Sequence, residues 1–157
     1  MHRFVLFITL ILVIAVFATS SVAQTITLNN NLVFGNMFPS IPKTITKYTV
    51  GSAAEFHVAG TIGSEISVQF TLPTYMSNSG FTIQLIFFDT DLAFDTRPNP
   101  NQGSPLFDNL NPWTTLTEIL GAGGLTIYLG GTAVPKIIQF PGAYTATIVL
   151  TVAYTGA

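Results

Sequence analysis

The chain has 157 residues and a formal net charge of −2, and 8% of its residues are charged against 48% that are hydrophobic. Soluble domains usually carry about a quarter charged residues. The apolar content excludes a disordered chain, and five Lys and Arg residues are too few for electrostatic binding of nucleic acid. The absence of cysteine excludes disulfides, a thiolate metal site and a cysteine nucleophile. The length predicts a single domain.

The N-terminus has the pattern of a secretory signal peptide. Arg3 precedes an apolar run, Phe4–Ala18, which is short for a helix that spans a bilayer and typical of a signal-peptide core. Small residues follow as far as Ala23, in the pattern of an A-x-A-like cleavage site, so we predict cleavage before Gln24. The alternative is an uncleaved membrane anchor.

Cleavage at this position defines the working chain and its compartment. Residues 1–23 are then the signal peptide, and residues 24–157 form one domain that is exported to the extracellular space, the cell surface or the periplasm. The signal peptide takes Arg3 with it, whereas all seven Asp and Glu residues remain, so the mature chain is mildly acidic. The membrane is expected to contact the protein only through the signal peptide before cleavage.

Alternation of apolar and polar residues with period two predicts β-strands along the whole mature chain. The strongest runs are Glu65–Leu72, Phe81–Phe88 and Tyr144–Tyr154. The weaker runs are Thr25–Leu28, Leu32–Phe34, Thr44–Val50, Ala54–Ala59, Leu125–Leu129 and Lys136–Phe140. Threonine, which is β-branched and favours strands, occupies many outward positions where Lys and Glu are usual.

Turn residues separate these runs, and no helical period of comparable length appears. Glycines in segments 60–63, 121–124 and 130–131 predict turns. This spacing predicts an all-β, antiparallel, immunoglobulin-like β-sandwich of about seven to nine strands. The one long irregular stretch, Asp89–Glu118, predicts a functional loop or a loop that contains a short helix or hairpin, for which Leu110–Leu120 is the candidate.

Four short segments occur in an order that resembles a known family. They are Leu32-Val-Phe-Gly35, Phe56-His-Val-Ala-Gly60 with Gly63 and Ile66–Pro73, Leu129-Gly-Gly-Thr132, and Gly142-Ala-Tyr-Thr-Ala-Thr147 continuing to Tyr154. This order resembles the bacterial family called domain of unknown function 4402. The resemblance implies a secreted β-sandwich similar in outline to fimbrial and spore-coat-type subunits, with no established catalytic residues. Ile62 and Ala146 depart from the pattern, because the family usually has Pro and Gly there.

The mature chain offers few groups for catalysis. His57, its only histidine, shares a strand face with Glu55 and lies opposite Phe56 and Val58, so we expect a solvent-facing position. One histidine without cysteine is too few for a zinc site. No G-x-S-x-G motif is present, and no pair of carboxylates stands out as a glycosidase pair. We therefore predict that the protein is not an enzyme and needs no cofactor.

The only acidic cluster is a weak candidate for calcium. Asp89, Asp91 and Asp95 offer oxygen ligands at close spacing, which suits a hard cation. The segment lacks the glycine turn and the closing glutamate of a calcium-binding loop. A solvated loop at the end of a strand is therefore the preferred interpretation, and we predict no metal.

The loop around Trp113 is a candidate for binding carbohydrate. The indole could stack on a sugar ring beside the polar side chains of Asp108, Asn109 and Asn111. A tryptophan in this position serves equally well as a plug that closes one end of a sandwich. The plug is the preferred interpretation.

The first strand after the cleavage site is a candidate for assembly. Ile26 and Leu28 alternate with Thr25 and Thr27, and strand edges with few charges are poorly protected against pairing with another chain. This segment can complete its own sheet or add to a neighbouring subunit. Self-completion is preferred, because the segment is short for a donor strand with a linker.

The shortage of acids, bases, nucleophiles and ligands makes a structural role the leading hypothesis. We predict a cell-surface or extracellular subunit of a filament, a pilin-like appendage or a coat, which assembles with copies of itself or with other surface subunits through strand edges. The neutral surface suits such packing. The alternative is an adhesive or carbohydrate-binding module, with a glycan as the partner of the loop around Trp113.

Overall fold

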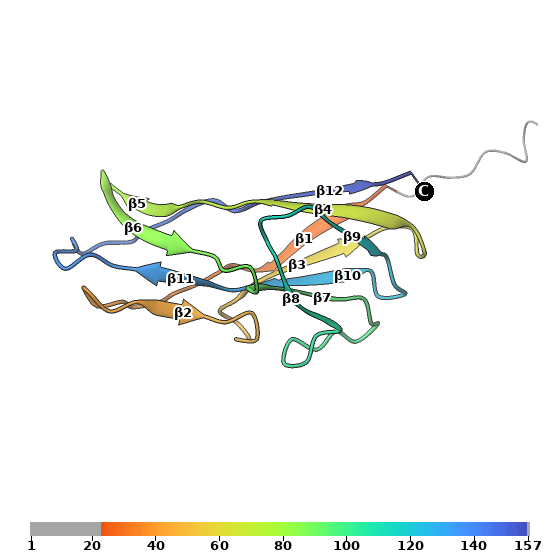
Figure 1. Cartoon of the computed structure of the whole chain (residues 1–157), viewed down its shortest axis with the longest axis horizontal. Coiled ribbons are helices and arrows are strands. Elements are labelled where there is room, and N and C mark those ends of the chain that lie inside the picture. Colours follow the sequence, from red (N-terminus) through yellow and green to blue (C-terminus); the bar gives the residue numbers. More distant parts are fainter. Residues whose placement is uncertain (1–22, 157) are drawn as a thin grey trace, which may run out of the picture.

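The computed structural model describes residues 23–156, so the predicted signal peptide, apart from Ala23, lies outside the described residues (Figure 1). The described chain contains no helix and twelve strands, all paired antiparallel, which confirms the all-β prediction. The strands are β1 (Thr25–Asn30), β2 (Lys43–Ile45), β3 (Ala54–Ala59), β4 (Glu65–Thr71), β5 (Tyr75–Asn78), β6 (Phe81–Ile86), β7 (Leu92–Asp95), β8 (Phe107–Leu110), β9 (Leu116–Ile119), β10 (Leu125–Leu129), β11 (Gly131–Val134) and β12 (Val149–Tyr154).

The strands form the two layers of a sandwich (Figure 1). One layer has the order β12-β4-β9. The other has the order β1-β3-β10-β7-β8, and it continues into β2-β11-β6-β5 because β10 passes into β11 at Gly130. β5 joins the layers at one end, since it pairs with β6 while the backbone of Ser77 exchanges two hydrogen bonds with Thr145.

The core lies between the layers and is built from the inward positions of each strand. In β4, Ile66, Val68 and Phe70 are buried, whereas the residues between them face outward. Phe70 meets Phe56 of β3 edge-on, with the ring centroids 5.8 Å apart. Each fully buried side chain of this size stabilises the fold by about 1.5–3 kcal/mol, so the alternation decides which face of each strand turns inward.

The strand predictions are confirmed for Ala54–Ala59 and Leu125–Leu129 and are wrong at Leu32–Phe34 and Lys136–Phe140, which form no strand. In the first segment Val33 makes one backbone hydrogen bond, to the Ser52 carbonyl at 2.8 Å. The second lies between Pro135 and Pro141. Proline has no N–H group and disrupts a strand ladder.

Two other predicted strands are shorter than their patterns. The run Thr44–Val50 reduces to β2, because the chain turns after Ile45, with the Thr49 N–H bonded to the Thr46 carbonyl at 2.9 Å. The C-terminal run Tyr144–Tyr154 forms β12 only from Val149 onward, after the isolated bridge at Thr145.

The stretch Asp89–Glu118 is more regular than predicted, which raises the strand number above the expected seven to nine. It holds β7, β8 and part of β9. β7 is buried at all four positions and therefore shows no period-two pattern. β5 was also missed. Gly130 marks no turn: a Cβ there would lie 2.6 Å from the Ile45 carbonyl oxygen, so this close backbone approach requires glycine.

Candidate functional site

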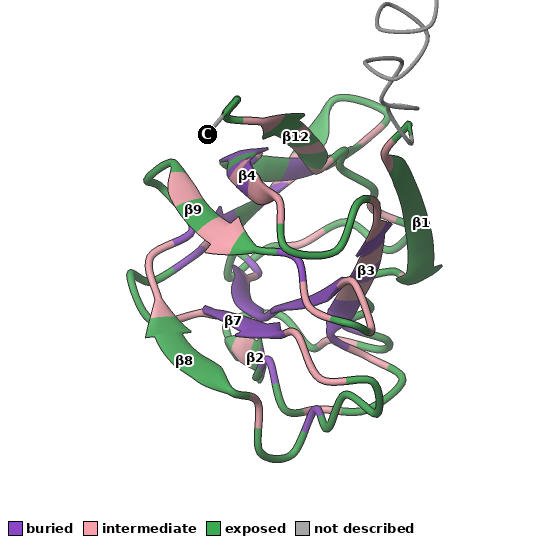
Figure 2. Cartoon of the chain, turned by 90° about the vertical axis from the view of Figure 1, so that its right-hand side faces the viewer, coloured by how far each residue is buried: buried purple, intermediate pink, exposed green. Residues whose placement is uncertain are grey.

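One side of the sandwich is left open between two edge strands. β1 is the last strand of one layer and β12 the last strand of the other, and Figure 2 shows them on neighbouring corners of the molecule. Two cavities, of about 860 Å³ and about 300 Å³, lie along this side and share Leu32 in their walls. We call this region, from β1 and residues 31–39 across to residues 139–150, the open side.

The inward side chains of β1 are not covered by the opposite layer of the sandwich. Ile26 pairs with Val58 of β3, and Leu28 pairs with Phe56. Paired residues of neighbouring strands share a face of the sheet, yet Val58 and Phe56 are 0% and 7% exposed, whereas Ile26 and Leu28 are 45% and 51% exposed. The difference arises because no strand of the described chain covers the β1 edge from the opposite layer.

The opposite wall presents a strand edge with unused hydrogen-bonding groups. The N–H of Thr155 donates to the Glu65 carbonyl at 3.1 Å, so the odd-numbered residues of β12 bond toward β4. By the same alternation, the N–H group of Leu150 points the other way. No strand of residues 23–156 lies on that edge of β12.

Gln24 closes the open side at one end. With its side-chain amide oriented to satisfy both groups, the NH₂ donates to the Val152 carbonyl at 3.1 Å and the oxygen accepts from the Tyr154 N–H at 2.9 Å. These are two hydrogen bonds that an added strand would make with β12. The free edge of β12 is therefore confined to the start of the strand, at Leu150.

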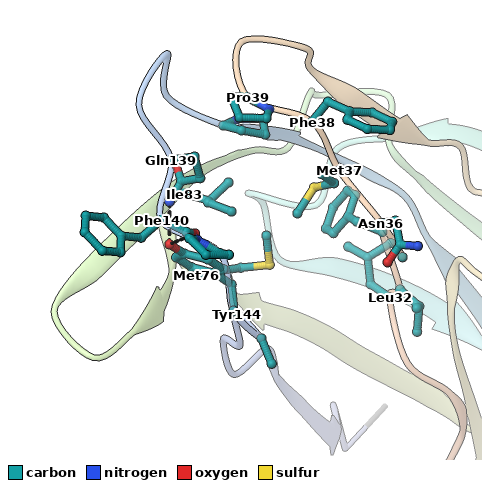
Figure 3. Close-up of a pocket in the computed structure, with 17 residues that line it drawn as sticks. Leu32, Asn36, Met37, Phe38, Pro39, Met76, Ile83, Gln139, Phe140 and Tyr144 are labelled. Atoms are coloured by element: carbon teal, nitrogen blue, oxygen red, sulfur yellow. Dashed lines mark hydrogen bonds between the residues drawn. The ribbon is translucent and has the colours of Figure 1, made fainter.

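The larger cavity is apolar, and Figure 3 shows Met37 and Met76 reaching into it from opposite sides. Tyr144 fixes one wall: its hydroxyl donates to the Phe140 carbonyl at 2.8 Å and accepts from the Gln139 amide at 2.5 Å. No Lys, Arg, Asp or Glu lines either cavity. The open side thus combines apolar side chains with free main-chain groups, and a charge lies beside it, the Lys43 ammonium, which donates to the Asn36 carbonyl at 3.2 Å.

The rim of the larger cavity carries exposed apolar residues from two loops. Ile137 and Ile138 are 83% and 85% exposed, and Phe38 is 69% exposed. The Ser40 N–H donates to the Lys136 carbonyl at 3.2 Å and so holds the two loops together. Exposed apolar residues gathered beside an apolar groove mark an interaction surface more often than an ordinary solvent-facing surface.

The side of the sandwich that ends in β8 is built differently, and we call it the closed side. Lys47 is buried, and its ammonium donates to the Thr90 carbonyl at 2.6 Å and the Asn109 amide oxygen at 3.0 Å. It also forms an ion pair with Asp108 at 2.7 Å. Burial opposes ionisation of Asp108, but the hydrogen bonds from Lys47 and Tyr48 outweigh it and keep the pKa of this carboxyl below its ordinary value.

A second ion pair completes the closed side. The buried carboxylate of Asp95 accepts hydrogen bonds from the Arg97 guanidinium at 2.5 and 2.9 Å and from the backbone N–H groups of Arg97 and Asn101 at 3.0 Å. Burial raises the pKa of Asp95, but these bonds outweigh burial and lower it overall. No buried side-chain N or O atom between residues 23 and 156 lacks a partner.

The candidate calcium ligands are not brought together. Asp95 is engaged by Arg97, the carboxylate of Asp91 accepts from the Phe88 N–H at 2.8 Å, and Asp89 is exposed. Across the described part of the chain, no group of three or more His, Asp or Glu residues is placed to hold a metal ion. The separation arises because β7 turns Asp95 into the protein.

The candidate carbohydrate loop is tied to the sandwich instead of presenting its polar groups. The Trp113 indole N–H donates to the Phe87 carbonyl at 2.8 Å, and its ring meets that of Phe87 edge-on at 6.3 Å. Asp108 and Asn109 bind Lys47, and the Asn111 amide oxygen accepts from the Trp113 backbone N–H at 2.9 Å. This arrangement supports the preferred interpretation of Trp113 as a plug, although the side chain stays half exposed.

The first strand pairs within its own chain. β1 lies antiparallel to β3, which agrees with self-completion as the preferred alternative. His57 lies on the outer face, where its Nδ1 is 3.3 Å from the Thr126 hydroxyl. The sequence does not reveal the larger cavity, because the alternation in Leu32–Phe34 and Lys136–Phe140 predicts strands where residues of both segments line it. The two flanking prolines were the available signal against the second strand.

The comparisons with known proteins leave the site to be interpreted from its geometry. No protein-family model matches the chain, and no curated protein sequence matches it either. The resemblance to domain of unknown function 4402 therefore stays a prediction. In residues 23–156 no helix is long and apolar enough to cross a membrane.

Proposed function

We propose that this protein is an exported, non-enzymatic structural subunit that works by associating with other subunits through the edges of its β-sandwich. A filament, a pilin-like appendage or a coat at the cell surface or outside the cell is the assembly that we propose. The observation that carries the proposal is the open side, where the edge strands β1 and β12 flank two cavities without charged lining residues, the larger of them mainly apolar. Unprotected strand edges of this kind favour pairing with another chain.

Two further features support a role in assembly. Among residues 23–156, no three or more His, Asp or Glu residues are grouped to hold a metal ion, and the ionic groups on the closed side are used in internal pairs. The resemblance to domain of unknown function 4402, which we also propose as the family of this chain, implies the same kind of exported subunit.

The association state of residues 24–157 tests the proposal. We expect size-exclusion chromatography and sedimentation velocity to show association that increases with protein concentration, and electron microscopy to show any larger assembly. A chain that stays monomeric at the highest soluble concentration contradicts the proposal.

Export is tested separately at the N-terminus. We expect the protein recovered outside the cytoplasm to begin at Gln24, since cleavage there removes the predicted signal peptide. A secreted or surface-bound chain that keeps residues 1–23 contradicts the cleavage and favours the membrane anchor.

A carbohydrate-binding module is the second proposal, and the half-exposed indole of Trp113 is the observation that favours it. Binding to a broad glycan array that is lost in Trp113→Ala and retained in Trp113→Phe would support it, because both aromatic rings stack on sugars. No binding on the array contradicts it.

A further inference from the structure

We infer that the open side binds the open side of a second copy of this chain, with main-chain pairing along the free edge of β12. The inference rests on the proposed function and specifies its surface and partner. It depends on three observations, which are the unused N–H group of Leu150 in β12, the lack of charge in the groove, and the presence of matching apolar elements on the same surface.

The free edge of β12 determines which backbone conformation a partner must have. The N–H group of Leu150 points away from β4 and is placed to donate to an extended backbone that lies alongside. Gln24 already makes such bonds at Val152 and Tyr154, so the edge is adapted to hydrogen bonding and is left open only over its first half. An added strand would extend the order β12-β4-β9 by one position.

The lining of the groove restricts the chemistry of the partner. Neither cavity has a charged lining residue. A basic or acidic peptide would have to lose the hydration of its charges without gaining an ion pair, which is unfavourable. The partner must therefore bring an extended, uncharged segment with apolar side chains.

This chain carries such segments on the open side itself. β1 has no charged residue, and its inward side chains Ile26 and Leu28 are half exposed. The exposed Ile137 and Ile138 lie on the rim of the larger cavity, next to Gln139 and Phe140 of its wall. One surface thus holds both a groove with a free strand edge and the apolar elements that fit it. Such self-complementarity is what a two-fold contact between identical subunits requires.

Hydrogen exchange on the unaltered mature chain provides the direct test. The N–H group of Leu150 should exchange rapidly in dilute, monomeric protein and slow by about tenfold or more where sedimentation shows a dimer, because pairing protects an amide. The N–H of Leu106, in the loop before β8, should keep its rate. Equal rates for Leu150 in monomer and dimer overturn the inference.

Three single substitutions with matched chemistry locate the contact. Leu28→Lys and Ile138→Lys place a charge on the open side, and Ile119→Lys places one on β9, at the far edge of the same layer as β12. All three residues are about half exposed or more, at 51%, 85% and 56%, so the fold should tolerate the lysine. We expect the first two to raise the dimer Kd by about tenfold or more, while Ile119→Lys leaves it unchanged.

The outcomes separate this inference from the proposed function. A dimer that survives both open-side substitutions, or that only Ile119→Lys dissociates, overturns the inference and leaves assembly through another edge standing. A continuous series of larger oligomers without a distinct dimer also overturns the inference, because a two-fold contact closes at the dimer. A monomer at every concentration overturns both. Where a lysine variant fails to fold by circular dichroism, the exchange measurement on the unaltered chain decides.

Discussion

The open side and the closed side are the two ends of the same layer, β1-β3-β10-β7-β8, yet they meet solvent in opposite ways. At the β8 end, the buried Lys47 and Asp95 form ion pairs with the partly exposed Asp108 and Arg97. At the β1 end, no charge lines the groove and Leu28 stays half exposed. Charged residues protect strand edges against unwanted pairing, so their use at one end alone points to the other end as the place for a partner.

The largest expected effect of removing a charge is on the closed side. Asp108→Ala removes the counter-ion of buried Lys47 and should lower the free energy of unfolding by about 3 kcal/mol. Asp89→Ala, at an exposed aspartate in the loop before β7, should change it by less than about 0.5 kcal/mol. Urea unfolding followed by tryptophan fluorescence measures both. Equal effects would mean that the ion pair does not hold this side together.

Acid should weaken the closed side. The pKa values of Asp95 and Asp108 are lowered in the folded protein, so the unfolded chain binds more protons at mildly acidic pH. The stability that these carboxylates contribute is complete above their ordinary values near pH 4 and is lost as pH falls through the folded values. Unfolding free energies between about pH 6 and pH 2 should therefore fall, and Asp108→Asn should flatten the slope. An unchanged slope in that variant contradicts the assignment.

On the open side, truncation should cost the monomer little. Leu28→Ala should lower the free energy of unfolding by about 1 kcal/mol, because half of the side chain is already in water. Phe56→Ala, at its buried cross-strand partner, should cost about 3–5 kcal/mol. Both are measured on dilute protein, where association does not contribute. A Leu28 variant as damaging as the Phe56 variant would show that the open side is covered in solution.

The smallest effect concerns the plug. Trp113→Phe keeps an aromatic ring against Phe87 but loses the indole hydrogen bond to the Phe87 carbonyl, which should cost about 1 kcal/mol. Thermal unfolding followed by circular dichroism measures the change. No change in stability would mean that the indole is held by contacts other than this bond.

The parts of the fold that alternation alone determines were predictable from the sequence. Ala54–Ala59 matches β3, whose burial alternates between its two faces. Leu125–Leu129 matches β10, because Thr126 and Tyr128 alternate with apolar residues in its sequence even though all five positions are buried. β7 was missed because all four of its residues are buried, which erases the period. Lys47 also carried no local signal, because its acceptors Thr90 and Asp108 lie far along the chain.

The open side was predicted only in part. Ile26 and Leu28 were identified from the pattern of β1, but the cavity depends on which strand faces that edge, and this is a property of sheet order. Pro135 and Pro141 were visible in the sequence as a break between β11 and β12. What they do not reveal is that the broken segment forms the wall of a cavity with Met37.

The bridge from Gln24 to β12 has a consequence for the order of folding. It joins the first residue of the predicted mature chain to the last strand, so it can form only after almost the whole polypeptide is available. Contacts between the two ends of a chain are the slowest to find. β4, which needs β12 as its neighbour, therefore stays unpaired on one side until the last strand is available, and during that interval the nascent sandwich is most exposed to mispairing.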